Sequence, residues 1–180
     1  HGLAHERLDA EAIRRRYPPF AVPDDTVGVL ERQAGALMCE RIVAGQARLA
    51  ITAGAELHGH APVIGWRVEP DRVVLETAVG RFEADRLILA AGPWTGRLLA
   101  DLGLPLTTTR QVVGWFQPRR PTRFTPAAMP VWGLESPAGG FVYGFPQLPD
   151  RPGVKVAHHV VGRPVDPDAM ARDVAPEERA

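Results

Sequence analysis

The sequence predicts a mixed α/β (α+β) fold, and three observations support that class. Residues 87–91 form an uncharged apolar run that Gly92 and Pro93 interrupt, the pattern of a buried strand, a tight turn and a helix start. Residues 39–53 carry apolar side chains at helical spacing. Short β-rich runs separated by turn-like pairs stand on either side of these segments. Because an uncharged apolar strand is covered on both faces, we expect 87–91 to lie in a parallel or mixed sheet surrounded by helices.

The N-terminal region predicts two helices and one strand. Residues 8–17 read as a helix with Asp9 as its N-cap and charges that match the helix dipole, and a proline pair stops it. Residues 27–30 form a candidate strand. The helix predicted over 39–53 ends at Gly54.

The middle of the chain predicts an antiparallel meander. A short strand over 55–58 precedes it, and a helix over 94–102 follows the apolar run. An alternating pair, His58 and His60, can ligate a metal, but no third ligand lies nearby in the sequence, which favours surface histidines and predicts no metal site. The strands of the meander are expected at 63–69, 72–77 and 81–83.

The C-terminal region predicts further antiparallel strands. Residues 106–116 are rich in β-branched side chains. Residues 131–135 and 141–145 bracket the turn-forming sequence Ser-Pro-Ala-Gly-Gly, which predicts a hairpin. Another strand is expected over 154–161, and Asp168 is placed to cap a terminal helix.

Composition excludes several classes of protein. The chain has 180 residues, enough for one domain or two small lobes, and its net charge of zero gives no reason to expect a nucleic-acid or membrane-surface partner. A single cysteine, Cys39, excludes an internal disulfide framework and fits a reducing, cytoplasmic compartment. No apolar run approaches the ~20 residues that span a bilayer. Because the chain begins at His1 and stops in a charged stretch, we expect it to be a segment of a longer protein.

Lys155 is the only lysine in the sequence and lies in an alternating strand pattern. Period-two geometry puts Lys155 and His159 on one face, roughly 13 Å apart. Such a pair can supply positive charge to an anionic substrate or intermediate. Alternatively, it marks the solvent face of an edge strand, where lysine guards against aggregation.

Tyr143 alternates with Phe141 and Phe145, so the three rings share one face. An aromatic stripe of this kind is typical of a core, and it can also line a substrate pocket. The chain contains no Gly-x-Ser-x-Gly elbow, no P-loop and no Gly-x-Gly-x-x-Gly fingerprint. Taken by themselves, the residue patterns therefore identify no complete active site.

Several blocks nevertheless resemble one enzyme family along nearly the whole chain. The sequence is similar to the middle portion of the FAD-dependent amine oxidases related to D-amino acid oxidase. Within them it resembles the branch of monomeric sarcosine oxidase and N-methyltryptophan oxidase. Ala-Ala-Gly-Pro-Trp is shared broadly by such flavoproteins, whereas three later blocks are more specific to that branch. The blocks of the match lie at 14–20 with Pro-Asp-Asp at 23–25, then at 28–37, 54–57, 84–99 (with Ala-Ala-Gly-Pro-Trp at 90–94), 110–116, 143–146 and 154–159.

The resemblance implies a two-lobe plan. Residues 38–103 would form part of a Rossmann-like FAD-binding lobe. Residues 1–37 and 104–180 would form two parts of a substrate (catalytic) lobe with an antiparallel sheet. The substrate lobe would therefore be discontinuous in sequence.

The resemblance also implies roles for individual residues. Lys155 matches the family lysine near the flavin that assists the reaction of reduced flavin with oxygen. Tyr143 and His159 match positions that line the substrate cavity. The residues expected beside the cofactor are Ala91, Gly92 and Trp94, with Gly92 allowing close backbone approach.

The implied reaction is oxidation of the C–N bond of a secondary, N-methyl amino acid such as sarcosine, giving an imine and hydrogen peroxide. The substrates would be a small amine and oxygen, with no nucleic acid and no membrane. The dinucleotide fingerprint and the family's C-terminal part are missing, and Cys39 does not sit at the flavin-linking position. We therefore expect the complete FAD site to need residues outside this chain and the segment alone to be inactive. A related dehydrogenase that does not use oxygen and a non-catalytic binding module that keeps the fold are the alternatives.

Overall fold

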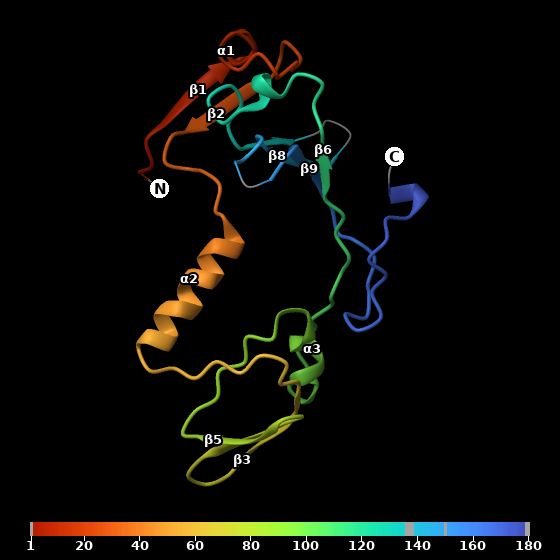
Figure 1. Cartoon of the computed structure of the whole chain (residues 1–180). Coiled ribbons are helices and arrows are strands. Elements are labelled where there is room, and N and C mark those ends of the chain that lie inside the picture. The colour runs from red at the N-terminus through yellow and green to blue at the C-terminus, as the bar shows by residue number, and fades with distance from the viewer. Residues whose placement is uncertain (1, 136–138, 150, 179–180) are drawn as a thin grey trace. The chain divides into compact units, whose positions relative to one another are not determined.

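The computed structural model describes residues 2–135, 139–149 and 151–178 (Figure 1). It confirms a mixed α/β fold, with helices and antiparallel sheets. The chain divides into two compact units. Unit 1 comprises His1–Leu37, Gln111–Gly162 and Arg172–Ala180, and unit 2 comprises Met38–Arg110 and Arg163–Ala171. The assignment of substrate and FAD-binding lobes stays a prediction.

Unit 1 begins with a strand pair and a short helix. Strand β1 (His5–Asp9) pairs antiparallel with β2 (Val27–Glu31), and α1 (Ala10–Arg16) follows β1 directly. Asp9 caps α1 as predicted, because its carboxylate accepts a hydrogen bond from the Ala12 amide at 2.8 Å. Strand β1 was not predicted, since among its five side chains only that of Leu8 is buried.

The second part of unit 1 is a four-stranded antiparallel sheet, in the order β6-β9-β8-β7. The predicted hairpin and the predicted strand after it are confirmed, while residues 136–138 of the predicted turn lie outside the described residues. The bounds are Gly114–Phe116 for β6, Trp132–Glu135 for β7, Phe141–Phe145 for β8 and Val154–His159 for β9.

The strand predicted over 106–116 is wrong for most of its length, because only β6 is a strand. Further upstream, Thr109 forms one isolated bridge with Pro164. Two backbone hydrogen bonds of 3.0 Å flank this bridge, from the Arg110 amide to the Arg163 carbonyl and from the Val165 amide to the Thr108 carbonyl, and the described residues on either side form no longer ladder.

Unit 2 opens with the confirmed helix α2 (Cys39–Thr52), which ends before Gly54 at a φ of +94°. None of its side chains is buried. The strand predicted over 55–58 is wrong, since this segment is exposed and pairs with no described strand. No helix among the described residues is both long and apolar enough to cross a membrane.

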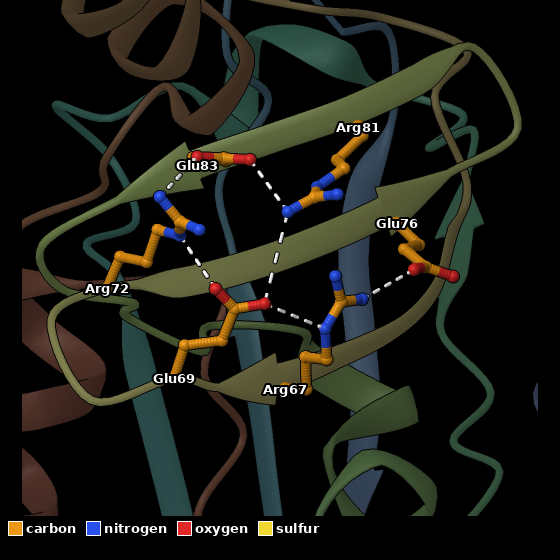
Figure 2. A network of polar contacts seen from close by, with 6 residues as sticks. All are labelled: Arg67, Glu69, Arg72, Glu76, Arg81 and Glu83. Atoms are coloured by element: carbon orange, nitrogen blue, oxygen red, sulfur yellow. Dashed lines mark hydrogen bonds and ion pairs between the residues drawn. The ribbon is translucent and has the colours of Figure 1, made fainter.

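The predicted meander is confirmed as β3 (Val63–Val68), β4 (Val73–Thr77) and β5 (Gly80–Ala84). Val74 on β4 is completely buried, because Arg67 and Glu83 pair with it from the neighbouring strands. These two side chains belong to a network of charges on one face of the sheet (Figure 2). Its members are Arg67, Glu69, Arg72, Glu76, Arg81 and Glu83.

The buried strand expected over 87–91 is wrong, and Ile88 is 89 % exposed. A central strand needs a neighbour on each edge to satisfy its amides and carbonyls, and no described segment pairs with 87–91. The helix predicted over 94–102 is broken into three short turns. They are the 3₁₀ turn η1 (Gly92–Trp94), α3 (Thr95–Leu98) and the 3₁₀ turn η2 (Ala100–Leu102).

The terminal helix predicted after Asp168 is also wrong. Among the residues described beyond it, the structure has only a 3₁₀ turn, η4 (Pro176–Glu178). The carboxylate of Asp168 instead accepts side-chain hydrogen bonds from Trp94 and Arg97.

Candidate functional site

The four-stranded sheet of unit 1 brings Lys155, Tyr143 and His159 to one face. Lys155 pairs with Phe145 across β9 and β8, and His159 pairs with Phe141 on the same two strands. Tyr143 stands between these pairs, opposite Ala157. Because alternate residues of a strand point to the same side, the shared face predicted for Lys155 and His159 is confirmed.

Aromatic rings surround the ammonium group of Lys155. Its Nζ lies 4.7 Å from the ring centroid of Phe145, 5.6 Å from that of Trp115 and 5.7 Å from that of Tyr143. The side chain is half-buried, and within the described part of the chain it has no carboxylate partner. A positive charge held over ring faces in this way is a cation–π arrangement.

The rings continue from Lys155 toward His159. The ring centroids of Tyr143 and His159 lie 6.3 Å apart at an interplanar angle of 65°. Phe141 stands edge-on to His159 at 6.4 Å. The face can therefore hold a flat or apolar group against aromatic rings, next to the positive charge of Lys155.

The second predicted group, Ala91, Gly92 and Trp94, lies in unit 2 at the turn that contains η1. Gly92 has a φ of +53°, in the left-handed region that favours glycine. A Cβ added at Gly92 would meet nothing within 4 Å, so its backbone is open to close approach by a ligand. Ala91 is half-buried, and Trp94 is partly exposed.

A polar cluster fixes this turn to a segment far along the chain. The indole Nε1 of Trp94 donates to Asp168 at 2.7 Å, and Arg97 donates to Asp168 and to Asp166, the latter at 2.9 Å. These hydrogen bonds, first from Trp94 and then from Arg97, lower the pKa of Asp168. The cluster therefore keeps Asp168 ionised and the Trp94 ring in place.

Sequence reasoning missed two of these features. It did not connect Trp115 with Lys155, because the pairing of these two residues depends on which strands are neighbours. It also missed Asp168 as a partner of Trp94, from which it is separated by 74 positions. No local signal in the sequence connects the members of either pair.

No group of three or more histidine, cysteine or acidic side chains among the described residues could hold a metal ion. His58 instead contacts Glu56 at 3.2 Å, and its ring lies 4.8 Å from that of Phe82. His60 has a φ of 55°, in the left-handed region.

Comparisons with known proteins place these residues in context. Residues 1–179 match the family model described as FAD dependent oxidoreductase. The chain is 40% identical over 179 residues to monomeric sarcosine oxidase of Streptomyces avermitilis, covering 98% of this chain and 46% of that protein. It is 33% identical over 175 residues to N-methyl-L-tryptophan oxidase of Salmonella typhi, covering 97% of this chain and 43% of that protein.

A solved structure has a similar fold. NikD, described as an unusual amino acid oxidase essential for nikkomycin biosynthesis, superposes in its open form with a TM-score of 0.76 at 26% identity. The match covers 98% of this chain and 46% of that one. The chain thus spans about half the length of the relatives it matches.

Proposed function

The chain belongs to the FAD-dependent oxidoreductase family, and from this premise we propose that the whole protein oxidises the C–N bond of a secondary, N-methyl amino acid such as sarcosine. The products are an imine and hydrogen peroxide. The observation that carries the proposal is the single lysine of the chain, held among aromatic rings on the sheet face that also bears Tyr143 and His159. The names of the similar proteins support the same class of substrate.

The described residues fit part of a flavin site. The open backbone at Gly92 and its positive φ suit close approach by a bound group, and we assign Ala91, Gly92 and Trp94 to the cofactor. The Gly-x-Gly-x-x-Gly fingerprint that holds the diphosphate is absent from these 180 residues. The proposal keeps residues 38–103 as part of the FAD-binding lobe and residues 1–37 and 104–180 as parts of the substrate lobe, with the complete site needing residues outside this chain.

The flavin, when bound, supplies the redox chemistry, and the protein supplies binding, orientation and charge. We assign to Lys155 the stabilisation of negative charge that develops on oxygen. A preorganised cation needs no reorganisation when that charge appears, and its effect is largest where rings exclude water. We assign to Tyr143 and His159 the lining of the amine-binding surface, where aromatic faces suit an N-methyl group.

Oxygen and a small amine are the partners of this proposal, with no nucleic acid and no membrane surface. A cytoplasmic location belongs to it as well, in keeping with a single, exposed cysteine.

The test begins with the colour of the purified whole protein, which should carry flavin absorbance. Anaerobic mixing with sarcosine or another N-methyl amino acid should bleach the flavin, and oxygen should restore it. Lys155→Met should slow the oxygen step about 100-fold or more while leaving bleaching within a few-fold, on the scale of one lost charge-stabilising group. Lys155→Arg, which keeps the charge, is the matched control and should retain part of the rate.

A colourless protein that takes up no added FAD would contradict the enzyme and favour a binding module. A protein that is bleached by the amine but reoxidised only by another electron acceptor would indicate a dehydrogenase. Equal slowing of both steps in Lys155→Met, or slowing of neither, would remove the role assigned to Lys155.

A further inference from the structure

We propose that Trp115 is a positioning residue for Lys155, holding its ammonium group at one place on the sheet face. The inference rests on the proposed function, because it gives Trp115 an effect on the oxygen step through Lys155. It concerns a residue on a different strand, separated from Lys155 by 40 positions.

The backbone brings the two residues together. Trp115 is the middle residue of β6 and is the direct antiparallel partner of Lys155 on β9, which in turn is paired with Phe145 on β8. Residues directly opposite each other in a sheet point to the same side, with Cβ atoms about 5 Å apart. Trp115, Lys155 and Phe145 therefore form one row across three strands.

The side chains complete the arrangement. The ammonium of Lys155 approaches three rings, and Trp115 has the largest π surface of the three. The side chain of lysine is long and flexible. The half-buried ammonium of Lys155 has no carboxylate partner among the described residues. The surrounding rings are therefore what fixes its position. Without the indole, the ammonium of Lys155 keeps the rings of Phe145 and Tyr143 from β8 but has no ring on the side of β6.

A second cation shares the indole. The guanidinium of Arg151 also lies 5.6 Å from the ring centroid of Trp115. Trp115 is thus in contact with two positive groups, and its ring occupies space into which either could otherwise move. Trp115 is also 45 % exposed, so it is not a core residue. Its contacts with two cations and its exposure together favour a role in positioning charge.

The experiment uses the flavin-loaded whole protein and measures the two half-reactions separately. Trp115→Leu should slow the oxygen step about fivefold, the scale of one cation–π contact, with bleaching by the amine unchanged within twofold. Trp115→Phe, which restores a ring, should recover most of the loss. Phe116→Leu removes an exposed ring from the opposite face of β6 and is the matched control, so it should leave both steps unchanged.

Lys155→Met separates this inference from the proposed function. If Lys155→Met slows the oxygen step, adding Trp115→Leu should slow it no further, because both changes act through the same ammonium. Independent losses that multiply in the double variant would overturn the positioning role. If Lys155→Met does not slow the oxygen step, it is the proposed function that fails.

A second readout does not depend on turnover. Protein labelled with ¹³C-lysine, with the Lys155 signal assigned by its loss in Lys155→Met, reports the ε-methylene of Lys155 directly. Ring currents should shift that signal in the parent protein, and Trp115→Leu should move it toward the position of free lysine. Phe116→Leu should leave it in place. An ε-methylene signal unmoved by Trp115→Leu, or a change confined to the KM for the amine, would overturn the proposal.

Discussion

The indole of Trp94 donates its N–H to the carboxylate of Asp168 at 2.7 Å, across 74 positions of sequence. Arg97, one turn further along the chain than Trp94, donates to the same carboxylate. The turn at Gly92 is therefore anchored by a charged side chain from a distant loop and not by a continuous helix. This anchor is exposed, so salt screens its charges, and it is strongest while Asp168 is ionised.

The first prediction concerns pH and Trp94. Because the pKa of Asp168 is lowered in the fold, the stability that its ionised carboxylate gives the cluster is present above the ordinary range of an aspartate and is lost as the pH falls through the lowered value. We expect the fluorescence of Trp94, taken as the difference from Trp94→Phe, to change in acid below about pH 4.

Asp168→Asn is the control for this prediction. An asparagine keeps an acceptor oxygen for the indole but does not titrate in this range, so the acid transition of Trp94 should disappear. A transition that persists in Asp168→Asn would assign it to another group.

The second prediction uses two glycines with the same backbone conformation. Gly92 has a φ of +53° and Gly103 a φ of +62°, and an added Cβ meets nothing within 4 Å at either. Alanine at each position should destabilise the fold by about 1 kcal/mol, the cost of a left-handed residue. Only Gly92→Ala should also weaken FAD binding, because only Gly92 is assigned to the cofactor.

FAD release on dilution, followed by flavin fluorescence, measures the difference between the two variants. Equal flavin affinity in Gly92→Ala and Gly103→Ala would show that the effect is backbone strain alone. It would then remove Gly92 from the cofactor site.

The third prediction contrasts two other glycines. Gly45 lies in the interior of α2 with open space around it, so Gly45→Ala should stabilise the protein by up to about 1 kcal/mol. A Cβ at Gly144 would lie 2.7 Å from the backbone oxygen of Lys155 and 2.5 Å from the ring of Trp132. Gly144→Ala should destabilise the protein by about 1–3 kcal/mol and disturb the strand that carries Lys155. Urea unfolding of the two variants measures opposite changes in midpoint, and a stabilised Gly144→Ala would contradict the packing at this position.

Local chemistry explains which parts of the structure could be predicted from sequence. Three correct predictions depend on residues within a few positions of each other. They are the cap at Asp9, the helix before Gly54 and the common face of Lys155 and His159. Spacing rules hold over such distances. The pairing of Trp115 with Lys155 depends on which strands are neighbours in the sheet. The alternation of side chains along one strand does not specify that order.

The incorrect predictions have a related cause. Residues 87–91 have the composition of a central strand, but composition does not supply neighbours, and none of the described segments pairs with them. Outside β6, the strand expected over 106–116 finds only one bridge partner among the described residues, Pro164. Within the same stretch, Arg110 is buried and donates to the carbonyl of Ala171, a partner 61 positions away.

The last prediction concerns the charged face of the meander (Figure 2). Glu69 contacts Arg67 at 3.1 Å, Arg72 at 2.7 Å and Arg81 at 3.9 Å, whereas Glu76 contacts only Arg67 within the network, at 2.6 Å. Glu69→Gln should therefore lower the thermal midpoint more than Glu76→Gln, and added salt should reduce the difference.

The pH dependence has a definite sign. Hydrogen bonds from Arg72 and Arg67 lower the pKa of Glu69, so its stabilising effect is present above the ordinary range of a glutamate and is lost as the pH falls through the lowered value. The difference between the parent protein and Glu69→Gln should accordingly be full at neutral pH and vanish in acid. Equal midpoints at neutral pH and low salt would mean that the arginines over Val74 hold their positions by packing alone.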